Sequence, residues 1–148
     1  MSNNFHIIIA DWNQHKSTLE SLRKTVFVDE QSVPEELEWD GHDDDCTHFL
    51  VSIDGQFIAT ARLKPDGQIG RMAVLKEHRR AGVGSALLDF IIEHAEHIGF
   101  KKIFLHSQVS AIEFYLRKGF EKTGDEFLDA NIPHQAMFRS IHPLSSTS

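Results

Sequence analysis

The apolar and polar positions along the chain repeat with two periods, and each period predicts one kind of element. Short apolar runs between turn signals predict strands, at residues 5–10, 47–53, 56–64, 68–75, 101–107, 120–128 and 135–141. Apolar residues three and four apart predict helices, at residues 17–29, 82–98 and 110–118. Residues 31–45 contain Pro34 and seven acidic side chains, so we expect a loop with one helical turn.

Turn signals connect these elements. Asp54-Gly55 is typical of a two-residue hairpin, and Pro65-Asp66-Gly67 marks a second turn, so the three strands around them form a meander. The long helix then connects the meander to a further strand by a strand–helix–strand crossover. We therefore expect an α/β fold with a mixed sheet in a single domain, residues 1–148, with residues 142–148 as a loose tail.

The composition fits a globular protein of the cytoplasm. The chain has 148 residues, of which 41% are hydrophobic and 25% charged, which is enough for one core. No apolar run approaches membrane-spanning length, and the first residues lack the pattern of a secretory signal. The single cysteine, Cys46, excludes an internal disulfide. The net charge of −7 argues against nucleic acid as a partner.

The most informative stretch joins the last strand of the meander to the long helix through a basic turn. The first amides of a helix lack internal partners and lie at its positive end, which binds phosphate. Gly82 and Gly84 let a ligand approach the backbone, and Arg79 and Arg80 add positive charge. The turn lacks the Gly-Lys-Ser/Thr of a P-loop. Leu87 stands where a dinucleotide-binding fingerprint needs its third glycine.

The turn resembles the pyrophosphate-binding motif of the GNAT superfamily of N-acetyltransferases, Gln/Arg-x-x-Gly-x-Gly/Ala. The resemblance implies that its amides hold the diphosphate of acetyl-CoA, and that the preceding strand end pairs with the pantetheine arm. The implied cofactor contacts are Met72, Ala73, Val74, Arg79, Arg80, Ala81, Gly82, Val83, Gly84 and Ser85. Arg80 stands where the family often has glycine, and Lys76 where it often has proline. Arg80 is therefore expected to constrain the turn.

A second segment carries the same resemblance through Ala-x-x-Phe-Tyr-x-x-x-Gly-Phe, which begins at Ala111. It implies that Tyr115 is the general acid that protonates the departing CoA thiolate. A phenol with a pKa of about 10 can deliver a proton to sulfur, whose thiol pKa is about 8.5. Phe114, Gln108 and Ser110 are further implied cofactor contacts, and Ser110 is also expected to cap its helix. Helix spacing alone also allows Phe114 and Tyr115 to be core residues.

The resemblance covers nearly the whole chain, and it narrows to the ElaA-like branch through residues 26–34, Glu38, Asp40 and residues 132–137. It implies a mixed, mostly antiparallel sheet with a central splayed parallel pair and helices on both faces. It also implies direct transfer of the acetyl group from acetyl-CoA to a primary amine of a small molecule or peptide.

The attacking amine must be neutral, and a base can remove its proton. Glu30, His106 and His134 are candidates for this base, and water is the alternative. The acidic residues between 35 and 45 either attract a cationic acceptor or are simply solvated.

Two other classes of function compete with this interpretation. A non-catalytic acyl-CoA-binding regulatory module would share the phosphate turn but need no general acid. A metal hydrolase lacks clustered ligands, since His94 and His97 share a helix face without the His-Glu-x-x-His pattern. Asp43-Asp44-Asp45 lacks the spacing of a calcium loop, so we expect no metal. Cys46 is expected to be a half-buried residue, and homodimer formation stays open.

Overall fold

The predicted hairpin forms at Asp54-Gly55, whose φ angles of 51° and 81° fit the mirror-image turn that two-residue hairpins need. The computed structural model describes residues 5–142. Its strands are β1 (Phe5–Ala10), β2 (Thr47–Ile53), β3 (Gln56–Leu63), β4 (Gln68–Val74), β5 (Lys102–Gln108), β6 (Glu121–Lys122), β7 (Phe127–Asp129) and β8 (Ile132–Ser140). Its helices are α1 (Trp12–Arg23), α2 (Glu35–Glu38), α3 (Val83–Ile98) and α4 (Ile112–Arg117), and a π-helical segment, Lys24–Glu30, continues α1.

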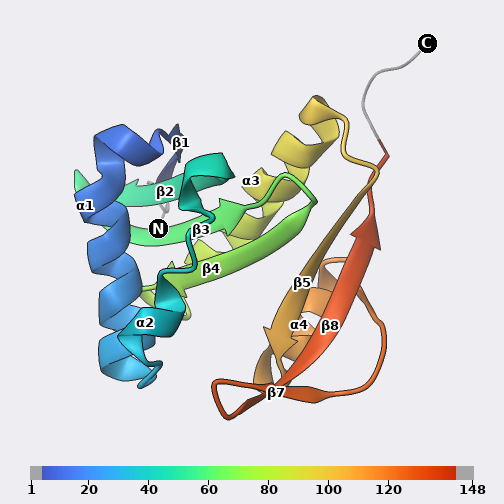
Figure 1. Ribbon diagram of the computed structural model, residues 1–148. Coiled ribbons are helices and arrows are strands. Elements are labelled where there is room, and N and C mark those ends of the chain that lie inside the picture. Colours follow the sequence, from blue (N-terminus) through green and yellow to red (C-terminus); the bar gives the residue numbers. More distant parts are fainter. Residues whose placement is uncertain (1–4, 143–148) are drawn as a thin grey trace.

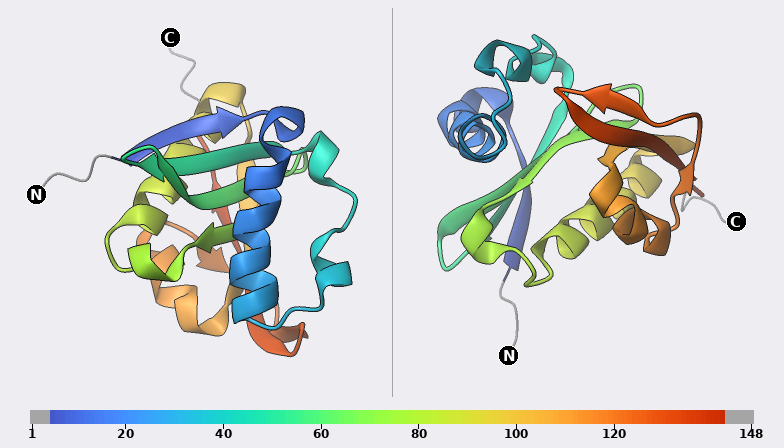
Figure 2. Two further views of the ribbon diagram at one scale, coloured as in Figure 1. Left: turned by 90° about the vertical axis from the view of Figure 1, so that its left-hand side faces the viewer. Right: turned by 90° about the horizontal axis from the view of Figure 1, so that it is seen from below.

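The strands form one sheet in the order β1-β2-β3-β4-β5-β8-β6, and β7 also pairs with β8. Every pair is antiparallel except β4 with β5, which is parallel. Helices α1 and α2 cover one face of the sheet, and α3 and α4 cover the other (Figure 2). The predicted mixed, mostly antiparallel sheet with helices on both faces is therefore confirmed.

The central parallel pair is splayed, as expected. Strands β4 and β5 are paired only at Gln68–Phe104 and Ile69–Leu105, and beyond these residues they diverge (Figure 1). The chain reaches β5 from β4 through α3, so the phosphate turn at the start of α3 follows the diverging end of β4. The splay therefore opens an edge on each of the two central strands.

The main core lies between the sheet and α3. The buried apolar residues of α3 recur at helical spacing and are Val83, Leu87, Leu88, Ile91, Ile92 and Ala95. They belong to one cluster with Phe49, Ile58 and Ile103 of the sheet. On the opposite face, Leu19 of α1 is buried against the sheet in a smaller cluster. Within residues 5–142, every helix is too short or too polar to traverse a lipid bilayer.

Helix α1 begins at Trp12, earlier than the predicted start at Ser17. The side chain of Asp11 accepts a hydrogen bond from the Gln14 amide at 3.0 Å, which is an N-cap. The first turn of the helix is mostly polar, so apolar spacing could not reveal it. The predicted loop after this helix contains α2 and a short 3₁₀ turn, Asp43–Asp45.

Three expectations near the C-terminal end need correction. Ser110 caps no helix, because it lies inside a 3₁₀ turn, Val109–Ala111, that precedes α4. The strand predicted at residues 120–128 is split into β6 and β7 by Gly124, whose φ is 72°. Ala130 and Asn131 have φ angles of 52° and 65° and form a tight turn that starts β8 earlier than predicted. The predicted tail lies outside the described residues, apart from His142.

Candidate active site

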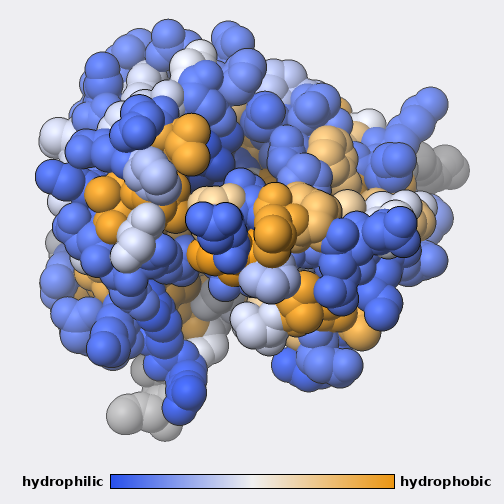
Figure 3. Space-filling view, turned by 60° about the horizontal axis from the view of Figure 1, so that its bottom comes forward, coloured by the Kyte–Doolittle hydropathy of each residue, from blue (hydrophilic) through white to orange (hydrophobic). Residues whose placement is uncertain are grey.

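A cleft of about 540 Å³ lies where β4 and β5 separate. Its walls come from five parts of the chain: the end of the π-helical segment, α2, the splayed strands, α4 and the turn before β8. The apolar lining residues include Phe27, Val33, Leu37, Met72 and Ile132. In the space-filling view, apolar side chains gather around a hollow in the middle of an otherwise polar face (Figure 3). The cleft combines apolar side chains with titratable groups between the two separated strands, which favours it as the active site.

A β-bulge in β4 shapes this cleft. The register between β3 and β4 shifts between Thr60 and Arg62, and the extra residue of β4 lies at Arg71, whose φ is 51°. A bulge bends its strand and increases the local twist. The bulge therefore turns the end of β4 away from β5, and Gly70 and Arg71 both line the cleft.

The basic turn has the geometry of an anion-binding helix start. Arg80 and Gly82 have φ angles of 65° and 86°, and no side chain caps α3 at Gly82. The first helical bond runs from the Ala86 amide to the Gly82 carbonyl at 3.0 Å, so the amides of Val83 to Ser85 lack intrahelical partners. Arg80 therefore has a left-handed backbone conformation, which residues other than glycine rarely adopt.

The two arginines of the turn have different surroundings. Arg79 donates to the Val74 carbonyl at 2.8 Å and to a Glu30 carboxylate oxygen at 2.7 Å. Arg79 therefore ties the turn to the end of β4 and to the π-helical segment. Arg80 is exposed on the outside of the turn. The predicted contact of either side chain with a diphosphate stays a prediction.

The Arg79 contact also changes the chemistry of Glu30. The hydrogen bond from Arg79 holds the pKa of Glu30 below its usual value, because it stabilises the charged form. A base works best when its pKa lies near the working pH. The geometry therefore makes Glu30 the least suitable of the three candidate bases.

Tyr115 lies on α4 and lines the cleft. Its hydroxyl oxygen is 4.0 Å from the Met72 sulfur on β4. Burial raises the pKa of Tyr115 to about 12, so the phenol keeps its proton at neutral pH. Phe114 packs edge to face on Tyr115, with ring centroids 5.0 Å apart, and touches the main core. Both aromatic rings therefore pack against the main core, and Tyr115 also lines the cleft. The cofactor contact predicted for Phe114 stays a prediction.

The two candidate histidines meet at one end of the cleft. Phe127 stacks on His134, with ring centroids 5.9 Å apart, and packs edge to face on His106 at 5.2 Å. The Nδ1 atom of His134 lies 2.7 Å from the Ile132 carbonyl oxygen, so only Nε2 remains for a ligand. Burial lowers the pKa of His106, so its ring is neutral at pH 7 and can accept a proton.

Gln108 and Ser110 have different positions. Gln108 lines the cleft, and its side-chain amide donates to Gln31 at 3.3 Å, so the two glutamines connect the ends of β5 and the π-helical segment. Ser110 is exposed and is not among the lining residues. The cofactor contacts predicted for both residues stay predictions.

Three acidic side chains of the segment belong to a partly buried ring of charges, whereas the other four, Glu35, Glu36, Asp44 and Asp45, are exposed. Arginines from α1, β3 and β4 alternate with the three acids, and neighbouring nitrogen and oxygen atoms are 2.8 to 3.2 Å apart. The pairs are Arg23–Glu38, Glu38–Arg71, Arg71–Asp40, Asp40–Arg62, Arg62–Asp43 and Asp43–Arg23. We call this set the charge ring. Sequence reasoning missed it, although Arg62 gave a signal: a charge within a buried strand needs a partner.

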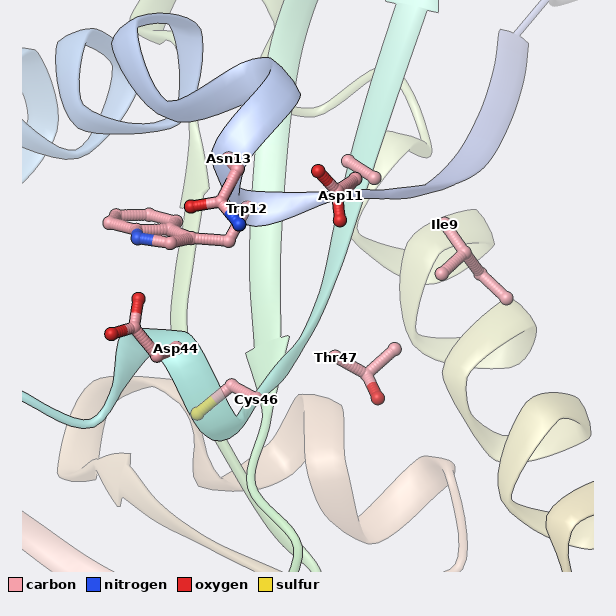
Figure 4. Close-up of a pocket in the computed structure, with 8 residues that line it drawn as sticks. Ile9, Asp11, Trp12, Asn13, Asp44, Cys46 and Thr47 are labelled. Atoms are coloured by element: carbon pink, nitrogen blue, oxygen red, sulfur yellow. The ribbon is translucent and has the colours of Figure 1, made fainter.

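A second cavity, of about 500 Å³, lies at the start of α1 (Figure 4). Trp12 and Asn13 line it from the helix, and Asp44 and Cys46 line it from the segment before β2. Burial raises the pKa of the Cys46 thiol, which donates to the His42 carbonyl at 3.0 Å, so the thiolate is disfavoured. In the described part of the chain, no three His, Cys, Asp or Glu side chains gather in a way that would hold a metal ion.

Comparison with known proteins assigns the family. A family model for the acetyltransferase (GNAT) domain matches residues 13–140. The N-acetyltransferase YjcF of Bacillus subtilis is 37% identical over 123 residues, which cover 80% of this chain and 87% of YjcF. An acyl-CoA N-acyltransferase from Pseudomonas aeruginosa superposes with a TM-score of 0.81 at 30% identity, and covers 93% of this chain and 99% of its own. ElaA of Escherichia coli gives a TM-score of 0.79 at 28% identity, with the same coverage of 93% and 99%. The chain belongs to the GNAT acetyltransferase family, and its resemblance to ElaA is confirmed.

Proposed function

We propose that the protein transfers the acetyl group of acetyl-CoA to a primary amine by direct attack. One observation carries the proposal: the uncapped start of α3 follows the end of β4 that has separated from β5, so an anion site comes directly after the open strand edge. A diphosphate on the amides of Val83 to Ser85 would place the pantetheine arm along β4. The proposal also agrees with the family, and with the similar protein from Pseudomonas aeruginosa that is described as an acyl-CoA N-acyltransferase.

The free edge of β4 supplies the donor for the oxyanion. The Leu75 amide donates to the Ile58 carbonyl of β3 at 2.9 Å. Successive peptide groups of a strand face opposite edges, so the amides of Val74 and Met72 face the side from which β5 has diverged. A backbone N–H in this position stabilises the charge that develops on the thioester oxygen.

The amine nitrogen forms a bond to the carbonyl carbon, the carbon–sulfur bond breaks, and the CoA sulfur takes the proton of Tyr115. The attacking nitrogen loses its extra proton to His106, His134 or water, and solvent restores the proton of Tyr115. Because thiols have pKa values near 8.5 and the Tyr115 pKa is about 12, the proton is shared with developing negative charge rather than released early.

The proposal can be tested in two steps. Calorimetric titration with coenzyme A should give saturable binding, and the absence of both heat and a thermal shift would contradict the cofactor assignment. Thiol release from acetyl-CoA should then be measured with a set of amines, peptides and polyamines. Binding without turnover for any acceptor would favour a regulatory acyl-CoA-binding module. We also propose a cytoplasmic location, because the lone Cys46 leaves no internal disulfide that would require an oxidising compartment.

A further inference from the structure

The charge ring contains one carboxylate that belongs to the cleft as well as to the ring. Glu38 lies at the end of α2, is only 3% exposed, and lines the cleft together with Leu37. Of the six ring members, only Glu38 and Arg71 are lining residues. The other members of the ring connect the acidic segment to the sheet. Glu38 is therefore the acid of the ring that can contact the proposed substrate.

The two oxygens of Glu38 have different surroundings. Arg23 donates to Oε2 at 2.8 Å, and Arg71 Nε lies 3.0 Å from the same oxygen as an ion pair without hydrogen-bond geometry. Oε1 accepts no hydrogen bond from the described residues. Among the described residues, the polar side-chain atoms that are inaccessible to solvent and lack a partner are His15 Nδ1, Arg62 Nε and Arg71 Nε. Glu38 Oε1 is not one of them, so solvent can reach it. Oε1 is therefore an open acceptor on a carboxylate that Arg23 holds in place.

Apolar side chains line the cleft beside Glu38, together with polar ones such as Gln31 and Arg71. Phe27, Val33 and Leu37 line the same part of the cleft, on the side of the π-helical segment and α2. Leu37 is 57% exposed, which is unusual for a leucine beside a buried ion pair. Leu128 of β7, beside the turn that lines the opposite wall, is 68% exposed. Apolar side chains that stay in water at the rim of a cleft indicate an apolar ligand.

The charge balance argues against a polycation. The three acids of the ring are matched by its three arginines, so the charge ring presents little net charge to the cleft. The remaining acidic residue in the lining is Asp129. A ligand with several positive charges would meet the guanidinium of Arg71 without enough carboxylates to compensate it.

On the basis of the proposed function, we propose that Glu38 Oε1 accepts a hydrogen bond from the acceptor nitrogen, and that the acceptor is a primary amine carried on an apolar body. Glu38 binds and orients the amine, and Leu37 and its apolar neighbours hold the body. Because two arginines keep the Glu38 carboxylate in one orientation, little side-chain entropy is lost when the amine binds.

The first test compares two probe amines with the wild-type enzyme. 2-Phenylethylamine should be acetylated with a kcat/KM about tenfold or more above that of spermidine. A preference for spermidine would overturn the apolar part of the proposal. Turnover of other amines but of neither probe would overturn the apolar-acceptor proposal alone. Binding of coenzyme A without turnover of any acceptor would contradict the proposed function itself, which is a different result.

The second test uses matched variants. Glu38→Gln and Asp43→Asn each neutralise one carboxylate of the ring, but only Glu38 lines the cleft. Glu38→Gln should lower kcat/KM for 2-phenylethylamine about 100-fold through KM, with the KM for acetyl-CoA unchanged, while Asp43→Asn changes it less than threefold. Equal effects of the two variants on the amine KM would show that Glu38 acts only through the ring.

A third pair of variants avoids the ring, so it does not depend on whether the ring variants fold. Leu37→Gln at the cleft and Ile98→Gln at the far end of α3 each change one leucine-sized, exposed side chain, 57% and 61% exposed respectively. Leu37→Gln should raise the KM for 2-phenylethylamine about fivefold, and Ile98→Gln should leave it unchanged. An unchanged KM in Leu37→Gln would remove this wall from the acceptor site.

Discussion

The hydroxyl oxygen of Tyr115 lies 4.0 Å from the sulfur of Met72, so the phenol of α4 reaches the strand that the pantetheine arm is proposed to follow. The contact is weak as a hydrogen bond, because sulfur in a thioether is a poor acceptor. Tyr115 is therefore held near β4 mainly by its packing against Phe114 and Phe120. Its proton is left available to a ligand in the cleft.

The first prediction concerns this proton. Tyr115→Phe should lower kcat about 100-fold or more, because the leaving thiolate loses its proton donor. Affinity for acetyl-CoA should change less than threefold, since the aromatic ring and its packing are kept. Steady-state kinetics and calorimetric titration measure the two quantities separately. A variant with wild-type kcat would remove Tyr115 from the mechanism.

The second prediction separates the phosphate site from the stability of α3. A side chain at Gly84 would meet no atom within 4 Å, whereas Gly82 has a φ of 86° that disfavours any other residue. Gly84→Glu should keep or raise the melting temperature, because an acidic residue in the first turn favours the helix dipole. It should also weaken coenzyme A binding at least tenfold, because the new carboxylate repels a diphosphate.

Gly84→Lys is the matched control for this prediction. A cation at the helix start is unfavourable for the helix but attracts phosphate, so the melting temperature should fall slightly while coenzyme A binding is kept. If both variants bind coenzyme A like the wild type, the diphosphate does not lie on the amides of Val83 to Ser85. Gly82 is less suitable for this test, because strain in the turn would by itself lower binding.

The third prediction concerns Glu30 and Arg79. Glu30→Gln should leave kcat within about twofold, because a carboxylate paired with arginine is a weak base. The pair is partly exposed, so its loss should cost less than about 1 kcal/mol in urea unfolding. The Glu30 pKa is lowered in the folded state, so this small stabilisation is present at neutral pH and fades as the pH falls below the usual value. A 100-fold loss of kcat would identify Glu30 as the base instead.

The sequence alone predicted the elements that have a clear hydrophobic period or a turn containing glycine. The hairpin at Asp54-Gly55, the long helix α3 and its start at Gly82 needed only local rules, and the structure has all of them. The features that the sequence did not predict depend on partners distant in the chain or on unusual backbone angles. The turn at Ala130-Asn131 has two left-handed residues without a glycine, so no turn signal marked it.

The charge ring at the candidate active site could not be predicted from the sequence either. Its members lie between residues 23 and 71, and no local spacing brings them together. Arg71 lies at a bulge that depends on the register of β3 with β4, which a single sequence does not specify. Tyr115 and the phosphate turn were predicted from motifs. The proposed role of Glu38 depends on the different contacts of its two carboxylate oxygens, which only the structure shows.

The charge ring leads to the last prediction, which concerns stability against pH. Burial opposes the charge of Asp43, but hydrogen bonds and the charges of Arg23 and Arg62 hold its pKa below the usual value. A carboxyl whose pKa is lower in the folded state stabilises the fold above its unfolded pKa of about 4, and this stabilisation is lost as the pH falls further. The wild type should therefore lose stability steeply below about pH 4.

Asp43→Asn should cost about 3 to 5 kcal/mol at pH 7, because Arg23 and Arg62 would each lose a partner while buried. Asp44→Asn, on an exposed neighbour in the same turn, should change the free energy of unfolding by less than about 0.5 kcal/mol. Urea unfolding at pH 7 and at pH 3 measures both effects. The difference between wild type and Asp43→Asn should shrink at pH 3, because this pH lies below the unfolded pKa of about 4, and proton uptake by Asp43 in the unfolded chain then favours unfolding of the wild type. A difference that is the same at both pH values would mean that Asp43 acts through its shape rather than through its charge.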